Sequence, residues 1–364
     1  MTTHLWIRAE SRPGERRTPV TPEGVKTLLE RGFRVTVEES GQRVFPIADY
    51  AAAGAEIAPE GSWPAAPREA LILGLKELPA DGTPLVHRHV FFAHAFKGQP
   101  GAGALLRRFA EGGGAIYDLE YLTDEHGRRL AAFGYWAGFA GAAASLMAWI
   151  AQQMRDGGPG PGEIAEEESR EALLGRLEAD LARFERRPSV LVIGALGRTG
   201  TGACDLARAL GLPLTRWDMA ETAHGGPFPE ILAHDIFLNC ILARPGTPLF
   251  VGEEAVAAPR KLAVIGDIAC DPGTPYSPIR LPGYEAPTSF SAPVLRVHES
   301  PPLDVMAIDN LPSMLPRESS EDFAAQLLPL LLATDRLGDG PWGRARAVFD
   351  EHLAGLSAGQ ENDG

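Results

Sequence analysis

The sequence of 364 residues predicts an α/β protein of two domains, each built on a parallel sheet covered by helices. The length corresponds to about two domains of roughly 150 residues each. Short apolar segments with strand composition alternate with helical segments, first in the N-terminal half and again from about residue 188. A glycine-rich run at 191–202 stands between a strand and a helix and opens the second series.

The N-terminal half begins with a strand candidate at His4–Ala9. A helix is expected next, because Thr21 is of the type that caps helices, Pro22 occupies its first position and Gly32 ends it. Residues 33–39 alternate between polar and apolar, as a half-buried strand does. The later elements expected in this half are strands at 69–77, 89–96 and 115–122 and a helix at 103–114.

Residues 130–154 contain no charged side chain and are long enough to cross a bilayer. They are nevertheless rich in glycine and alanine, and Gly134, Gly138 and Gly141 favour close packing against other protein segments. The composition therefore predicts a buried helix rather than a transmembrane one. The next segment, residues 155–172, is acidic and rich in proline and glycine, which predicts a solvated loop.

The second series starts with a helix that reaches about residue 185, followed by a strand at 190–194 and a helix at 201–210. Further elements are expected as strands at 214–218, 234–240, 261–269 and 295–299 and as helices at 320–337 and 343–356. We expect one domain to comprise residues 1–135 with 325–364, and the other to comprise residues 136–324.

The formal net charge of −14 argues against a nucleic-acid partner and against an anionic membrane surface. Cys204, Cys240 and Cys270 lack the spacing of a metal site and are typical of reduced thiols in a cytosolic protein. The N-terminal residues lack an apolar signal core before their charges. These observations predict a cytoplasmic protein without a metal, a nucleic-acid partner or a membrane anchor.

The glycine-rich run has the context of a dinucleotide-binding turn, with Gly194, Gly197 and Gly200 between a strand and a helix. Glycines let the backbone approach a pyrophosphate, and the helix N-terminus offers unpaired N–H groups. Asp218 ends the next strand, 18 residues after Gly200, where it would accept hydrogen bonds from ribose hydroxyls. Its charge would repel a 2′-phosphate, which favours NAD over NADP. The alternative is a tight turn in an unrelated parallel sheet.

Six residues of the N-terminal half are candidates for a substrate site. Lys76 ends an apolar strand, where burial lowers a lysine pKa and makes it a usable base. His94 lies among aromatic residues, and a histidine in such surroundings is, taken alone, more often a core residue than a catalytic one. Arg128 and Arg129 suit bidentate recognition of carboxylates, although a charged loop is the alternative. The same carboxylate chemistry is open to another pair, Arg16 and Arg17.

Nine segments, in order along the chain from near residue 5, carry a resemblance to a known family. They are LWIRAESRPGERRTPVTPEGV, GSWPAAPREALILGLKELP, FFAHAFKGQ, YDLEYL, GRRLAAFGYWAGFAGAA, VLVIGALGRTGTGA, WDMAETAHGGPF, IFLNCI and IDNLPSMLPRESSEDF. Together they resemble the NAD-dependent, lysine-forming saccharopine dehydrogenases, which belong to the wider alanine dehydrogenase group.

The resemblance implies two Rossmann-like domains with the active site in the cleft between them. It implies a substrate-binding catalytic domain, an NAD-binding domain and a protein that is a monomer or weak homo-oligomer. The implied reaction is the reversible oxidation of saccharopine by NAD and water, which gives lysine, 2-oxoglutarate and NADH.

The resemblance also assigns roles to residues. Lys76 would take the proton of the secondary amine as hydride leaves, and His94 would help water add to the imine. Glu120 would tune this pair. The positions implied for substrate binding are Arg17, Lys97, Gln99, Arg128 and Phe133, with Arg129 at either a carboxylate or the cofactor. The positions implied for the cofactor are Gly194, Gly197, Arg198, Gly200, Asp218, Thr222, Ile268, Ile308, Asp309, Asn310 and Leu311.

Four positions depart from the family pattern. Asn310 stands where histidine is usual, Ala269 where serine is frequent, Leu242 where tyrosine is frequent and Gly98 where an acid is usual. They leave open the amino partner and the direction of the reaction in the cell. The alternatives are a related NAD-dependent dehydrogenase of another N-substituted amino acid, of opine or alanine dehydrogenase type, and a non-catalytic NAD-binding module.

Overall fold

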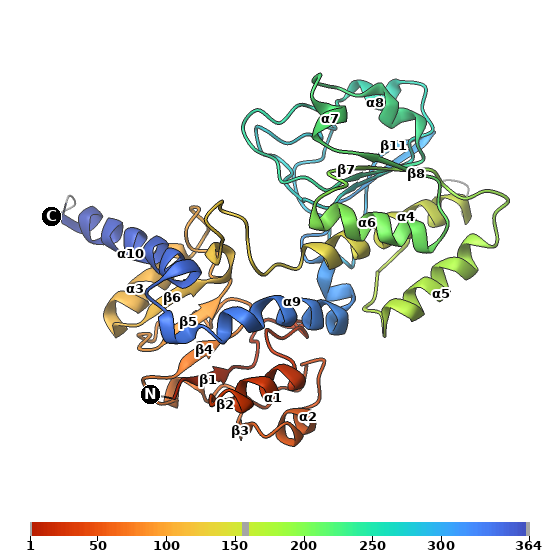
Figure 1. The fold of residues 1–364 in the computed structure, drawn as a ribbon. Helices are drawn as coiled ribbons and strands as arrows, with labels where there is room; N and C mark the ends of the chain where they lie inside the picture. The colour runs from red at the N-terminus through yellow and green to blue at the C-terminus, as the bar shows by residue number, and fades with distance from the viewer. Residues whose placement is uncertain (1, 155–159, 362–364) are drawn as a thin grey trace. The chain divides into compact units, whose positions relative to one another are not determined.

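The computed structural model describes residues 2–154 and 160–361, which divide into two units, each with its own sheet (Figure 1). The first unit runs to Ala132 and resumes at Ser319, and the second is Phe133–Glu318. Residues 155–159 of the expected acidic loop, and residues 362–364 of the expected first domain, lie outside the described residues.

The sheet of the first unit has six parallel strands in the order β3-β2-β1-β4-β5-β6. The strands are β1 (His4–Ile7), β2 (Arg34–Glu38), β3 (Glu56–Ala58), β4 (Leu71–Leu73), β5 (Arg88–Phe91) and β6 (Ala115–Asp118). The helices are α1 (Pro22–Glu30), α2 (Ile47–Ala52), α3 (Ala102–Gly112), α9 (Pro316–Leu331) and α10 (Gly340–Glu361). The chain adds β2 and β3 on one side of β1 and then crosses to the other side with β4. Ligands of open α/β sheets bind at such a reversal, beyond the carboxyl ends of the strands.

The first helix forms as the sequence predicts. The Thr21 hydroxyl accepts a hydrogen bond from the Gly24 N–H at 3.2 Å, which satisfies one of the unpaired donors of the first turn. Gly32 follows the helix with φ +82°, a left-handed conformation that glycine adopts without steric cost. The C-terminal helix α10 packs against β6, so the two ends of the chain build one unit (Figure 1).

The strands that carry the candidate residues are shorter than expected. β4 covers only 71–73 of the expected 69–77, because the N–H groups of Leu75 and Lys76 bind a side chain instead of a neighbouring strand. β5 ends at Phe91 instead of 96, and His94 has φ +48°, which is incompatible with a strand. β6 ends at 118 instead of 122, where a 3₁₀ turn begins. The strand β3 and the helix α2 were not predicted.

The second unit also has a six-stranded sheet, in the order β11-β12-β10-β9-β7-β8. The strands are β7 (Val190–Ile193), β8 (Leu214–Trp217), β9 (Ile236–Asn239), β10 (Val264–Asp267), β11 (Leu295–Glu299) and β12 (Pro302–Met306). The helices are α4 (Gly134–Met154), α5 (Arg170–Leu181), α6 (Arg198–Ala209), α7 (Met219–Thr222) and α8 (Glu254–Ala257). All pairs are parallel except the antiparallel pair of β11 and β12. Of these two strands, β12 was not predicted.

The uncharged segment forms α4, whose backbone touches that of α6. A Cβ atom on Gly138 would lie 1.8 Å from the Thr199 carbonyl oxygen, and one on Gly202 would lie 1.9 Å from the Tyr135 carbonyl oxygen. The prediction of a buried helix is confirmed, since its residues join the core of the second unit. Within the described ranges, no helix is both long and apolar enough to span a bilayer.

The contact between α4 and α6 predicts opposite effects for two glycine-to-alanine changes. Gly138→Ala should lower the free energy of unfolding by about 1–3 kcal/mol, because the new methyl group forces the helices apart. Gly175→Ala is the matched control, since Gly175 lies on α5 with no atom within 4 Å of its Cβ direction. That change should raise the free energy of unfolding by about 0.5–1 kcal/mol through backbone entropy. Denaturant unfolding of both variants measures the difference, and equal effects would contradict the described contact.

Candidate active site

Three candidate residues of the first unit follow three neighbouring parallel strands. Lys76 comes after β4, His94 after β5 and Glu120 after β6. The three strands pair in register, so their carboxyl ends lie at one edge of the sheet. This edge also includes the reversal between β1 and β4, the expected place of a ligand in such a fold.

A buried ion pair holds the backbone of Lys76. The Glu10 carboxylate accepts hydrogen bonds from the N–H groups of Leu75 at 2.6 Å and Lys76 at 2.9 Å. The Arg8 guanidinium lies 3.3 Å from Glu10 and donates to the Lys76 carbonyl. Arg8 and Glu10 are only 2% and 6% exposed, and a Cβ on Gly74 would lie 2.4 Å from the guanidinium. The turn that carries Lys76 is therefore fixed by the core. Sequence reasoning missed both charged residues, although they follow a strand at the sheet reversal.

The surroundings of Lys76 favour its neutral form. Burial lowers the pKa of Lys76, and the positive charges of Arg17 and Arg12 lower it further, against the opposing effect of Glu15 and Glu77. Arg17 itself is 3% exposed and binds Glu15 in a bidentate pair, with Nε–Oε1 and Nη2–Oε2 distances of 2.8 and 2.6 Å. In the structure, Arg17 is thus a buried cation beside Lys76, and its expected contact with a substrate carboxylate stays a prediction.

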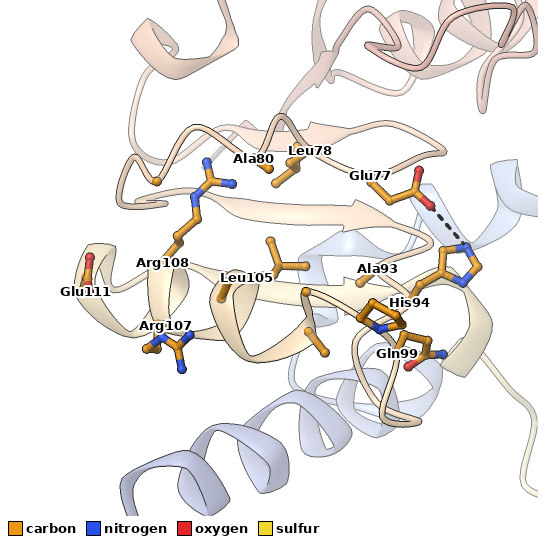
Figure 2. A pocket seen from close by; sticks show the side chains of 15 residues that line it. Glu77, Leu78, Ala80, Ala93, His94, Gln99, Leu105, Arg107, Arg108 and Glu111 are labelled. Atoms are coloured by element: carbon orange, nitrogen blue, oxygen red, sulfur yellow. Dashed lines mark ion pairs between the residues drawn. The ribbon is translucent and has the colours of Figure 1, made fainter. Parts of the chain in front are cut away.

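The His94 side chain is exposed and lies beside Glu77. Its Nε2 atom is 4.0 Å from the Glu77 carboxylate, and a dashed line marks this pair in Figure 2. Both side chains lie at one end of a pocket of 620 Å³ within the first unit, together with Gln99. The pocket walls continue over the apolar side chains of Leu78 and Leu105. The His94 side chain is therefore exposed on a pocket. The alternative drawn from its aromatic neighbours, a histidine buried in the core, is wrong.

Glu120 binds two positively charged side chains at this edge of the sheet. Its carboxylate accepts a hydrogen bond from Lys97 Nζ at 2.5 Å and another from Arg129. Burial would raise the pKa of Glu120, but Lys97, Arg129 and His94 together hold it below its ordinary value. Gln99 joins the group, because its side-chain oxygen accepts from the Lys97 N–H at 2.8 Å. The main charges that shift the pKa of Lys76 do not include Glu120, whose carboxylate instead binds Lys97 and Arg129, so its predicted tuning of Lys76 and His94 stays a prediction.

Arg128 lies on the turn that precedes Arg129. The Asp124 carboxylate accepts a hydrogen bond from the backbone N–H of Arg128 at 2.8 Å and so fixes the turn. The Arg128 side chain is exposed, and its guanidinium makes no ion pair in the part of the chain that the structure describes. Phe133 belongs to the second unit, where its carbonyl accepts the Ala137 N–H in the first turn of α4.

The three glycines of the predicted dinucleotide-binding turn differ in the space around their Cα atoms. A Cβ on Gly194 would lie 2.6 Å from Ile241, and one on Gly200 would lie 2.0 Å from the Gly194 carbonyl oxygen, so packing alone requires both glycines. A Cβ on Gly197 would meet only the Gly194 oxygen, at 3.5 Å, which is an ordinary contact. The space above Gly197 is the kind that a pyrophosphate occupies when it crosses the N-terminus of a helix, here α6.

Asp218 links the glycine loop to the next helix. Its carboxylate accepts the Leu196 N–H at 3.0 Å and caps α7, while Glu221 binds the Asp218 N–H at 2.7 Å. Gly194, Gly197, Asp218 and Thr222 all line one pocket of 790 Å³. A carboxylate has more acceptor sites than these bonds use, so ribose hydroxyls could still bind Asp218.

Two exposed apolar side chains on this pocket were not predicted as cofactor contacts. Met219 and Leu242 are 82% and 63% exposed and line this pocket, so a ligand bound there would cover apolar surface of both side chains. Leu242 drew notice in the sequence only because it departs from the family pattern. Exposure of this kind depends on the fold and has no signal in the sequence.

The remaining cofactor candidates do not line this pocket. Ile268 follows β10, and Ile308 and Leu311 follow β12, at the same edge of the sheet. Their side chains are 7%, 2% and 1% exposed and belong to the core, so a cofactor could meet mainly their backbone. Asn310 donates to the Ser313 hydroxyl at 2.5 Å, Asp309 is exposed, and Arg198 is the first residue of α6. Within the described residues, no group of three or more His, Cys, Asp or Glu side chains could hold a metal.

Comparison with known proteins agrees with this arrangement. The family model for the N-terminal domain of alanine dehydrogenase/PNT matches residues 6–140. The saccharopine dehydrogenase (NAD(+), L-lysine-forming) of Candida albicans is 45% identical over 97% of this chain and 97% of the relative. The chain belongs to this saccharopine dehydrogenase family. The enzyme of the same name from Schizosaccharomyces pombe is 44% identical over 95% of this chain and 97% of its own length.

The fold of this saccharopine dehydrogenase family member is also that of known structures. A solved structure of L-alanine dehydrogenase matches 92% of the chain, and 91% of its own length, with a TM-score of 0.65 at 18% identity. The predicted fold of two Rossmann-like α/β units is confirmed, and so is the family resemblance stated from the sequence.

The glycine loop gives a test of the cofactor site. We expect Gly197→Ala to leave the free energy of unfolding within about 1 kcal/mol but to weaken NADH binding about tenfold or more, because the methyl group meets the pyrophosphate. Gly200→Ala is the contrasting variant and should destabilise the second unit, because its methyl group overlaps the loop backbone. NADH fluorescence titration and denaturant unfolding measure the two effects. Unchanged NADH affinity in Gly197→Ala would mean that the pyrophosphate does not pass this residue.

Proposed function

We propose that the protein is an NAD-dependent saccharopine dehydrogenase, which converts L-saccharopine, water and NAD reversibly into L-lysine, 2-oxoglutarate and NADH. The observation that carries the proposal is Lys76, whose pKa is lowered by burial and by Arg17, on the same sheet edge as His94. The near full-length similarity to the lysine-forming enzymes supports the choice of substrate.

Lys76 is the base of the oxidation step in this proposal. It takes the proton of the secondary amine while the substrate carbon releases hydride, which leaves a carbon–nitrogen double bond. NAD accepts that hydride when it is bound. A base must be unprotonated to act, and the lowered pKa of Lys76 increases its neutral fraction near neutral pH.

His94 serves the hydrolysis that follows. It takes a proton from the water that attacks the imine carbon, and it returns a proton to the nitrogen when the carbinolamine collapses into lysine and 2-oxoglutarate. Its exposed side chain on a pocket lined partly by apolar residues supports both water access and binding of an aliphatic substrate chain. We assign substrate carboxylates to Arg128 and Arg17, with Lys97 and Gln99 beside them.

The cofactor assignments follow from the pocket of the second unit. We assign the pyrophosphate to Gly197 and the start of α6, and a ribose to Asp218. The Asp218 charge favours NAD over NADP. The division into a substrate-binding unit and an NAD-binding unit, a monomeric or weakly associating state and a cytoplasmic location are parts of the same proposal. The three cysteines without disulfides and the net charge of −14 support that location.

The test is the oxidation of NADH in the presence of lysine and 2-oxoglutarate. We expect turnover that requires both substrates, with little use of NADPH. If NADH is oxidised with another amine but not with lysine, the protein is a related dehydrogenase of a different N-substituted amino acid. Gly98, which lies beside Lys97 and departs from the family pattern, raises this alternative. If NADH binds but is not oxidised with any amine, the result would favour a non-catalytic NAD-binding module.

Substitution of the base gives a sharper prediction. Lys76→Met should lower kcat for saccharopine oxidation by about 10²–10⁴-fold and leave NADH affinity unchanged. The wild-type rate should rise with pH as Lys76 loses its proton, and the variant should lack this limb. Lys26→Met, on the exposed face of α1, is the matched control and should have normal kinetics. Normal turnover in Lys76→Met would remove Lys76 from the role of base.

A further inference from the structure

We propose that Asp118 is a positioning residue that holds the His94 loop and Glu120 in one fixed arrangement, an inference that rests on the proposed function. Asp118 ends β6 and is 1% exposed. Its Oδ2 accepts the Ala93 N–H at 3.2 Å, and its Oδ1 accepts the Glu120 N–H at 2.8 Å. One buried carboxylate thus joins the residue before His94 to the residue that binds Lys97 and Arg129.

The His94 backbone needs such a support. Its φ of +48° lies in the left-handed region, which costs a side-chain-bearing residue free energy unless its surroundings hold it. On one side of His94, Asp118 holds the Ala93 N–H. On the other side, the buried Phe96 ring packs against Tyr121 and His352, with ring centres 5.6 and 4.8 Å apart. These two anchors direct the imidazole toward the pocket and Glu77 (Figure 2).

The support depends on the charge of Asp118. Burial raises the pKa of Asp118 to about 7, and the Glu120 charge raises it as well, against the two N–H groups and Arg129. Of the other titratable groups nearby, Tyr121 interacts with Asp118 and His94 interacts with Glu120. From α10, which packs on β6, His352 contacts the Phe96 ring and Arg346 pairs with Asp350. Protonation removes the negative charge and turns one of the two oxygens into a hydroxyl, which is a poorer acceptor, so the N–H bonds to Asp118 weaken. The His94 loop should therefore loosen as the pH falls through about 7.

The first experiment is a double-mutant cycle. Asp118→Asn keeps the size of the side chain but replaces one acceptor by an NH₂ group. We expect it to lower kcat for saccharopine oxidation about 10- to 100-fold, with KM for saccharopine and NADH affinity nearly unchanged, because a displaced acid–base group slows the chemical steps. In a His94→Gln background the same change should cost less than about twofold, since Asp118 acts through His94. Asp49→Asn, on the exposed face of α2, is the matched control.

A second measurement uses the unaltered protein and no substrate. Hydrogen exchange of the segment 92–98, corrected for the intrinsic pH dependence, should show more protection at pH 8 than at pH 6. Asp118→Asn should show the low protection at both pH values. Additive rate losses in the cycle, an unchanged kcat, or protection that is equal at both pH values would overturn the inference. Absence of saccharopine turnover in the unaltered protein would instead reject the proposed function, and hydrogen exchange would still decide the role of Asp118.

Discussion

The buried ion pair between Arg8 and Glu10 is the constraint on which the rest of the candidate site depends. Both partners bond to the backbone around Lys76, through one guanidinium nitrogen of Arg8 and both carboxylate oxygens of Glu10, and so they fix that turn. Removing one partner would leave a buried charge without compensation, which costs several kcal/mol in typical proteins. The pair thereby sets the place of the proposed base, and Gly74 is a glycine because the Arg8 guanidinium occupies the position of a side chain.

The carboxyl edge of the first sheet also separates groups that organise the site from groups that can react. Glu10 and Glu15 are buried against arginines, and Glu120 is held ionised by Lys97 and Arg129. Lys76 instead has a lowered pKa, and His94 remains exposed. This division places an amine of lowered pKa and an exposed imidazole among fixed charges, an arrangement that suits the proposed transfer of two different protons.

Much of this arrangement could be predicted from local sequence signals. The Thr21 cap, the glycine loop before α6 and the position of Asp218 directly after β8 depend on neighbours within a few residues, and sequence patterns report such contacts. The early ends of β4 and β5 could not be predicted, because the residues beyond them bond to Glu10 and Asp118, which are far away in the chain. The burial of Arg8 depends in the same way on a distant partner, the carbonyl of Lys76.

The glycines show how fold and site share one segment. Gly202 allows α6 to touch α4, Gly194 and Gly200 close the loop, and only Gly197 is left without a packing reason. The same short helix must therefore sit close to α4 at its middle and present its N-terminus to the pocket. Because a helix is rigid over this length, the contact with α4 fixes the direction of its first N–H groups. A residue that opens the helix contact would also move the proposed pyrophosphate site, so the glycine spacing cannot be assigned to ligand binding alone.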